Sequence, residues 1–173
     1  MFESALNVKL RPAQVQDAAQ IAAVHVASWE TTYRGILPDA LLQMQSLEKR
    51  TQNWQDWLES QAMAWVWVAE KAGKIWGFVS GGPERSQEPE AQGEIYALYL
   101  LAEAQGLGIG KALLYKGFEE LHKAGYQGIL VWVARENLHA SRFYALQGGQ
   151  ALRERELQIA GFQIAETGYL WLG

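Results

Sequence analysis

Two hydrophobic periods alternate along the 173 residues of the chain. Apolar positions recur at helical spacing at 17–30, at 47–58 and after residue 110. Runs of β-branched and aromatic residues are typical of strands and occur at 7–12, 64–71, 74–82, 93–101 and 128–134. A short helical segment at 138–148 and two strand-like segments within 150–172 complete the pattern. The predicted order is therefore one strand, two helices, three strands, a helix, a strand, a helix and two strands.

Glycine, proline and polar residues mark the connections between these elements. We expect a loop at 31–39, a hairpin turn at 72–74 and a polar surface loop at 83–92. Gly125 stands where the helix after residue 110 needs a C-terminal cap. No internal repeat, low-complexity segment or linker interrupts the chain, so the sequence predicts one mixed α/β domain over residues 1–173.

The composition narrows the class of function. A net charge of -4 gives no broad attraction to nucleic acid or to an anionic membrane, and we expect neither as a partner. The sequence has no cysteine, and His25, His122 and His139 lack metal-ligand spacing, so no metal site is predicted. No apolar run approaches the ~20 residues of a membrane helix, and the first residues lack a signal-peptide pattern, so we expect a cytoplasmic protein.

The segment 101–114, LAEAQGLGIGKALL, carries alternate glycines at Gly106, Gly108 and Gly110, the last at the expected helix start. A strand, a glycine-rich turn and a helix N-terminus together favour phosphate binding, because bare backbone N–H groups and the helix dipole face one concavity. Hydrogen bonds to a charged group contribute about 1.5–3 kcal/mol each, whereas an exposed ion pair from Lys111 contributes about 0–1 kcal/mol. The competing interpretation is a tight turn with no ligand.

Two familiar phosphate motifs do not fit this loop. A P-loop needs Ser or Thr after its lysine, but Ala112 follows Lys111. A dinucleotide-binding loop needs a final glycine where Lys111 stands, and it belongs to the first βα unit of a fold. The remaining pattern is Q/R-x-x-G-x-G/A, which Gln105, Gly108 and Gly110 satisfy.

With this pattern the sequence resembles the GNAT superfamily of acyl-CoA N-acyltransferases. The stretch ENLHASRFYALQGG looks like the family motif N-x-x-A-x-x-x-Y, with Asn137, Ala140 and Tyr144. Ala102 stands where many members carry a proline shortly after the strand. This departure would loosen the start of the loop but leaves its N–H donors intact. The resemblance covers nearly the whole chain. It implies a mixed, mostly antiparallel central sheet of about seven strands flanked by about four helices.

The resemblance also implies acetyl-CoA as cosubstrate. In this family the fourth and fifth strands splay apart and the pantetheine arm lies in the gap like an added strand. Backbone groups of Leu98, Tyr99 and Leu100 would then pair with the arm, and Asn137 would hydrogen-bond it. The pyrophosphate would be held by the N–H groups of a continuous segment, namely Gln105, Gly106, Leu107, Gly108, Ile109, Gly110 and Lys111.

The implied reaction is direct attack of a primary amine of a small molecule or peptide on the thioester, within a ternary complex. Because an alkylammonium has a pKa near 10, a proton must leave first. Glu94 is the candidate base and would accept the proton through a water molecule. The alternative is that Glu94 is an ordinary acidic residue at a strand end. Tyr144 is the candidate acid that protonates the departing sulfur. The alternative is that Tyr144 only packs under the loop.

The acceptor wall is expected at the N-terminal helices, in the segment WETTYRGILP. Trp29 and Tyr33 would sheathe an alkyl amine or contact its cation. Glu30 would attract an ammonium and Arg34 would bind a carboxylate, two demands that point to different substrates and between which the sequence does not choose. Packing is the expected role of His25 and of the remaining tryptophans, Trp54, Trp57, Trp65, Trp67, Trp76 and Trp132.

Other functions remain open from the sequence. A catalytically silent acyl-CoA-binding sensor or interaction module would use the same fold. A nucleotide triphosphatase is disfavoured by the motif mismatches above. A homodimer is a further possibility, because aromatic residues are enriched at interfaces.

Overall fold

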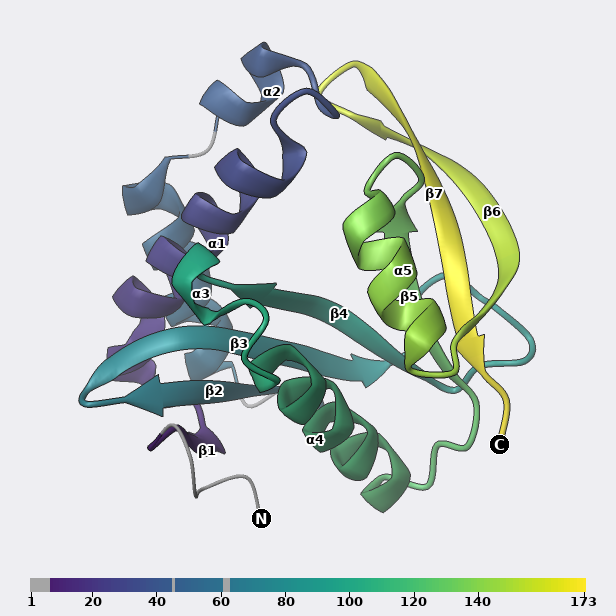
Figure 1. Ribbon diagram of the computed structural model, residues 1–173, viewed down its shortest axis with the longest axis horizontal. Helices are drawn as coiled ribbons and strands as arrows, with labels where there is room; N and C mark the ends of the chain where they lie inside the picture. The colour runs from purple at the N-terminus through teal and green to yellow at the C-terminus, as the bar shows by residue number, and fades with distance from the viewer. Residues whose placement is uncertain (1–6, 45, 61–62) are drawn as a thin grey trace.

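The computed structural model describes residues 7–44, 46–60 and 63–173, which form one seven-stranded sheet with helices on both faces (Figure 1). The strands and α-helices in chain order are β1 (Lys9–Pro12), α1 (Ala18–Tyr33), α2 (Asp39–Gln43), α3 (Leu47–Glu59), β2 (Trp65–Lys71), β3 (Lys74–Pro83), β4 (Gly93–Leu100), α4 (Ile109–Lys123), β5 (Ile129–Ala134), α5 (Leu138–Leu146), β6 (Gln150–Ile159) and β7 (Phe162–Trp171).

The sheet has the strand order β1-β2-β3-β4-β5-β7-β6. Every neighbouring pair is antiparallel except β4 and β5, which run parallel. Their shared ladder is short, from Gly93 opposite Ile129 to Ile95 opposite Val131, and beyond it the two strands diverge (Figure 1). The predicted fold class, a mostly antiparallel mixed sheet, is confirmed.

Two hydrophobic layers hold the helices to the sheet. Strand residues alternate between the faces, so Phe78 packs under α1 and α3 while the next residue, Val79, packs under α4. Ile21 and Val24 of α1 join the first layer, and Leu113 of α4 joins the second. Such buried aliphatic side chains each contribute about 1.5–3 kcal/mol relative to exposure. The tryptophans predicted to pack do so, although Trp132 has a second role described below.

Some helix boundaries differ from the prediction, and one α-helix was missed. The helix α1 continues to Tyr33, and the five-residue α2 begins at Asp39, so the predicted loop at 31–39 is shorter. The missed helix buries Leu41 in a small cluster with Ala134 of β5, a long-range contact that local spacing does not reveal. The helix α4 begins at Ile109 rather than Gly110.

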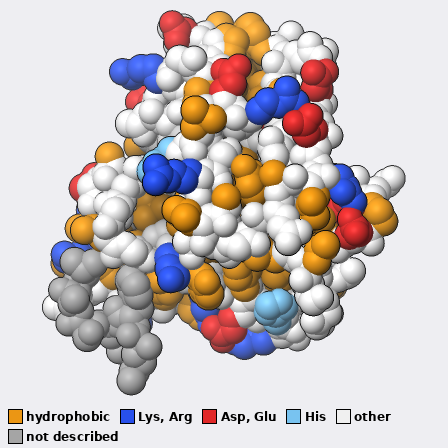
Figure 2. All heavy atoms as spheres, turned by 45° about the vertical axis from the view of Figure 1, so that its right-hand side comes forward, with side chains coloured by type: hydrophobic (Ala, Val, Ile, Leu, Met, Phe, Trp, Pro, Cys, Tyr) orange, Lys and Arg blue, Asp and Glu red, His pale blue; other side chains and the backbone are white. Residues whose placement is uncertain are grey.

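The surface carries charges of both signs. On the face that Figure 2 shows, acidic and basic side chains are interspersed with exposed hydrophobic ones. Within the described residues, no helix combines the length and the apolar character needed to cross a bilayer.

Candidate active site

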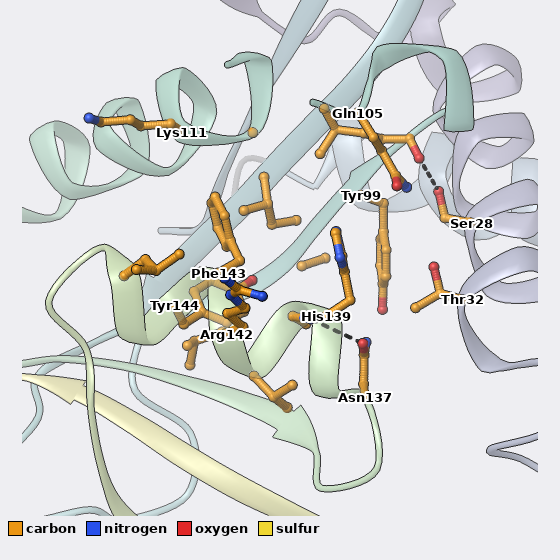
Figure 3. A pocket seen from close by; sticks show the side chains of 18 of the residues that line it. Ser28, Thr32, Tyr99, Gln105, Lys111, Asn137, His139, Arg142, Phe143 and Tyr144 are labelled. Carbon is orange, nitrogen blue, oxygen red and sulfur yellow. Dashed lines mark hydrogen bonds between the residues drawn. The ribbon is translucent and has the colours of Figure 1, made fainter. Parts of the chain in front are cut away.

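A cavity of about 620 Å³ opens where β4 and β5 diverge, bounded by the glycine loop and α5 (Figure 3). Most of the predicted cofactor-binding and catalytic residues line it: Leu98, Tyr99, Leu100, Gln105, Gly106, Gly108, Gly110, Lys111, Asn137 and Tyr144. Three predicted residues do not line it: Leu107, Ile109 and Glu94, whose position is described below. Leu107 is exposed on the outer side of the loop, and Ile109 is fully buried beneath it.

The glycine loop presents unused backbone donors. Gly106 and Gly108 adopt φ of 72° and 81°, in the left-handed region that favours glycine, and Gly108 is the N-cap of α4. The N–H groups of residues 106–111 donate no hydrogen bond of normal geometry to any described residue. Gln105 differs from the prediction, because its N–H donates to the Ala102 carbonyl at 3.2 Å. A run of free donors therefore ends at the positive end of the α4 dipole.

The strand β4 offers a free edge to the same cavity. Residues 98–100 pair with β3 on one side, Leu98 opposite Val79. Past Ile95 no described strand pairs with the other side. The Leu100 carbonyl accepts a hydrogen bond from Ser28 Oγ at 3.0 Å, which ties the strand end to α1 (Figure 3). This edge has the geometry that receives an extended ligand by β-strand addition.

The helix α5 supplies Asn137 and Tyr144. Asn137 is the N-cap, and its Oδ1 accepts a hydrogen bond from the Ala140 N–H at 3.1 Å (Figure 3). Its Nδ2 donates to no described residue and is left for a ligand. Tyr144 packs edge-on against Trp171, and burial raises the pKa of its hydroxyl. Tyr144 thus both packs and lines the cavity, and its phenol stays protonated at neutral pH.

A second, smaller cavity of about 190 Å³ adjoins the first. The two share a wall of four aromatic side chains, Tyr33, Tyr96, Tyr99 and Trp132. The second cavity is lined besides by Trp29, Leu37, Arg85, Glu94, Ile95, Ala134, Arg155, Ile159, Ile164 and Glu166. No group of three potential metal-ligating side chains occurs among the described residues.

Glu94 lies in the second cavity and not in the first. Its side chain is buried, and Oε1 lies 2.9 Å from Arg85 Nη2 while Oε2 accepts from the Arg85 backbone N–H at 3.0 Å. The Arg85 guanidinium also stacks over the Tyr96 ring at 3.7 Å. Glu94 is thus a paired carboxylate in the second cavity, beside the shared wall.

The shared wall is held in place from behind by α1. Trp29 Nε1 donates to the Tyr99 hydroxyl at 3.2 Å, and the rings of Trp29 and Tyr33 lie 4.9 Å apart. His25 stacks on Tyr99 at 4.9 Å and accepts a hydrogen bond from Trp54 at 3.2 Å. Burial, and after it the charge of Arg50, lowers the pKa of His25 to about 3. A neutral packing histidine is confirmed here.

Two predicted acceptor residues lie outside both cavities. Glu30 and Arg34 are exposed on and just after α1 and line neither one. The charged residues that do line the second cavity besides Glu94 are Arg85, Arg155 and Glu166. The sequence analysis missed them because they lie in the loop before β4 and in the last two strands, and only the sheet register brings them together.

Comparisons with known proteins agree with this geometry. The family model described as "Acetyltransferase (GNAT) family" matches residues 24–148. The uncharacterized N-acetyltransferase YuaI of Bacillus subtilis is 38% identical over 165 residues, which cover 95% of this chain and 92% of the relative. A probable N-acetyltransferase of Mycobacterium tuberculosis is 31% identical over 142 residues, 80% of this chain and 77% of that protein.

Solved structures show the same fold. The PaiA N-acetyltransferase of Thermoplasma acidophilum, in complex with coenzyme A, has a TM-score of 0.71 at 20% identity and covers 92% of this chain and 97% of its own. YncA of Salmonella typhimurium, described as a putative acetyltransferase with its cofactor acetyl-CoA, has a TM-score of 0.70 at 18% identity. The match covers 96% of this chain and 94% of the YncA chain. Since the family model spans most of the sequence and YuaI aligns along nearly all of it, the chain belongs to the GNAT family of acetyltransferases.

Proposed function

We propose that this acetyltransferase moves an acetyl group from acetyl-CoA to a primary amine of a small molecule or peptide. The observation that carries the proposal is the run of free N–H donors at residues 106–111, beside a cavity that follows the unpaired edge of β4. Coenzyme A and acetyl-CoA are bound in two GNAT structures of the same fold, which supports this choice of cosubstrate.

The donor set fits the parts of coenzyme A. The N–H groups of residues 106–111 and the α4 dipole would hold the pyrophosphate. The edge of β4 at Leu98, Tyr99 and Leu100 would pair with the pantetheine arm, and Asn137 Nδ2 would donate to it. One N–H of this edge would polarise the thioester carbonyl, for which an oxyanion donor contributes about 2.7–4 kcal/mol to transition-state stabilisation.

The chemistry is direct attack. The amine nitrogen forms a bond to the carbonyl carbon, the C–S bond breaks, and the products are an amide and the free thiol. Glu94 accepts the amine proton through water on the acceptor side of the shared wall. Tyr144, which lines the cosubstrate cavity, donates a proton to the sulfur. Trp29 and Tyr33 enclose the acceptor.

Two measurements test this function. Calorimetric titration with acetyl-CoA should show binding, and a thiol-release assay over a panel of primary amines should show turnover with some of them. Binding of acetyl-CoA without turnover on any amine would favour the silent acyl-CoA-binding module instead.

The same assay tests the base. Replacing Glu94 by Gln should lower kcat about 10²-fold at pH 7, the lower end for general base catalysis. The difference in kcat between the wild type and Glu94→Gln should become smaller above pH 10, where the amine is already deprotonated. A Glu94→Gln enzyme with the wild-type pH profile would exclude Glu94 as the base.

A further inference from the structure

We propose that the acceptor is an α-amino acid, whose carboxylate binds Arg155 while its amine faces the aromatic wall shared with the first cavity. The inference deepens the proposed function and rests on it. It names a substrate class for the second cavity and assigns specificity to a residue of β6.

Arg155 is held rigidly on two sides. It stands directly opposite Glu166 in the β6–β7 register, and its Nε lies 2.6 Å from Glu166 Oε2. The guanidinium also lies over the Trp132 ring at 4.1 Å. These two contacts fix both the position and the plane of the guanidinium, so little side-chain entropy is lost when it binds a ligand.

The terminal nitrogens of Arg155 remain available. The hydrogen bond to Glu166 uses Nε, and neither Nη donates to any residue that the structure describes. Two parallel N–H groups at the end of a guanidinium match the two oxygens of a carboxylate. Arg155 lines the second cavity and its side chain is 29% exposed, so its two terminal nitrogens are accessible to a ligand.

The remaining charges of the cavity suit a zwitterion. Arg85 and Arg155 supply two positive charges, and their partners Glu94 and Glu166 supply two negative ones. A ligand that carries one ammonium and one carboxylate preserves this balance, whereas an amine without an acid adds an uncompensated charge to a largely buried site. Glu94 is 4% exposed beside Tyr96 of the shared wall, where an amine must approach the thioester.

The size of the cavity limits the rest of the acceptor. A volume of about 190 Å³ is less than a third of the cosubstrate cavity, and aliphatic side chains, including Leu37, Ile159 and Ile164, form part of its wall. A single amino acid is therefore a better match than a folded protein or a long peptide.

The test compares each free α-amino acid with its own carboxamide in the thiol-release assay. The two have nearly the same shape, but only the acid carries the carboxylate. At least one acid should exceed its carboxamide in kcat/KM by 10-fold or more. Arg155→Gln should lower kcat/KM for that acid about 10²-fold, mostly through KM, and leave the carboxamide within about twofold. Arg155→Lys should have a kcat/KM for the acid between those of the wild type and Arg155→Gln, because an ammonium cannot form the two parallel hydrogen bonds of a guanidinium.

A matched control is Arg135→Gln. Like Arg155, Arg135 forms an ion pair with a glutamate, in this case Glu154 of β6, but the pair lies at an exposed site outside both cavities. This variant should leave the acid and the carboxamide unchanged.

Equal kcat/KM for acid and carboxamide in the wild type, or an equal loss on both in Arg155→Gln, would overturn the carboxylate site. A preference for amines that carry a phosphate over the acids would likewise overturn the amino-acid assignment. Absence of turnover with any amine would overturn the proposed function instead. Calorimetric binding of the amino acids to wild type and Arg155→Gln would then still decide the carboxylate site.

Discussion

The two cavities that share Tyr33, Tyr96, Tyr99 and Trp132 are built from different parts of the chain. The larger one presents main-chain groups: a row of N–H donors at residues 106–111 and the unpaired edge of β4. The smaller one presents charged side chains in ion pairs. In the proposed function, the main-chain donors bind acetyl-CoA, which is the same in every reaction cycle, and the charged side chains select the acceptor. The comparison explains why the larger cavity has the family's motifs and the smaller one does not.

The difference has a physical origin in sequence separation. The donors of the larger cavity follow one another in a single turn, so their geometry is set locally by the glycines. The Arg155–Glu166 pair depends on which residues of β6 and β7 stand opposite, and a slip of one residue would turn both side chains to the other face. The second cavity, the proposed acceptor site, is therefore the part of the molecule most open to change by substitution.

The largest effect is expected at Gly108. A valine there cannot keep φ at 81° without strain, so the N–H groups that precede and start α4 must turn away. Gly108→Val should raise KM for acetyl-CoA at least 10²-fold, about the loss of one or two hydrogen bonds to a charged group. Steady-state kinetics at varied acetyl-CoA measures it.

Gly125 provides the matched control. It follows the other end of α4 with φ of 88°, and a Cβ there would meet no atom within 4 Å. Gly125→Val suffers the same backbone strain without contact to the cavity, so its KM should stay near that of the wild type. If Gly108→Val also kept a normal KM, the N–H row would not bind the cosubstrate.

A smaller effect is expected behind the shared wall, from His25. The unfolded chain takes up a proton near the ordinary pKa of 6.5, whereas the folded protein does so near pH 3. Between these values the unfolded state binds more protons, so stability is complete above about pH 6.5 and is lost progressively as the pH falls toward 3. The loss should be about 2 kcal/mol between pH 7 and pH 5.

Urea denaturation at both pH values checks this loss. His25→Gln keeps an acceptor for Trp54 but does not titrate, so its free energy of unfolding should change by about 2 kcal/mol less than that of the wild type. The same pH dependence in both proteins would mean that His25 is not the group responsible.

The smallest effect is expected from Tyr144, the one side chain of the larger cavity with a proposed part in the reaction. Tyr144→Phe should lower kcat about tenfold and leave calorimetric binding of acetyl-CoA unchanged. The effect is below the range of about 10²–10⁴-fold that is typical of acid–base catalysis, because a thiol with a pKa of about 8.5 departs with little assistance. Equal turnover in the variant would leave Tyr144 with packing alone, against Trp171 and Phe143.

The order of elements and the glycine turn could be predicted because both follow from local pattern. Hydrophobic periodicity predicted every strand, and the alternate glycines predicted a turn with exposed backbone N–H groups, with an error of one residue at the start of α4. The helix α2 escaped prediction because five residues are too few to show a period. Glu30 and Arg34 have suitable chemistry and lie near Trp29 in the sequence, but both are exposed and line neither cavity.

The sequence by itself determined the elements, their order and the turn that exposes backbone donors, because each depends on neighbours within one helical or strand repeat. Only the tertiary structure decided that β4 and β5 part after Ile95, that Glu94 pairs with Arg85, and that Arg155 and Glu166 enter the second cavity. These facts depend on strand register and on packing between segments distant in the chain, and neither is encoded at any single position.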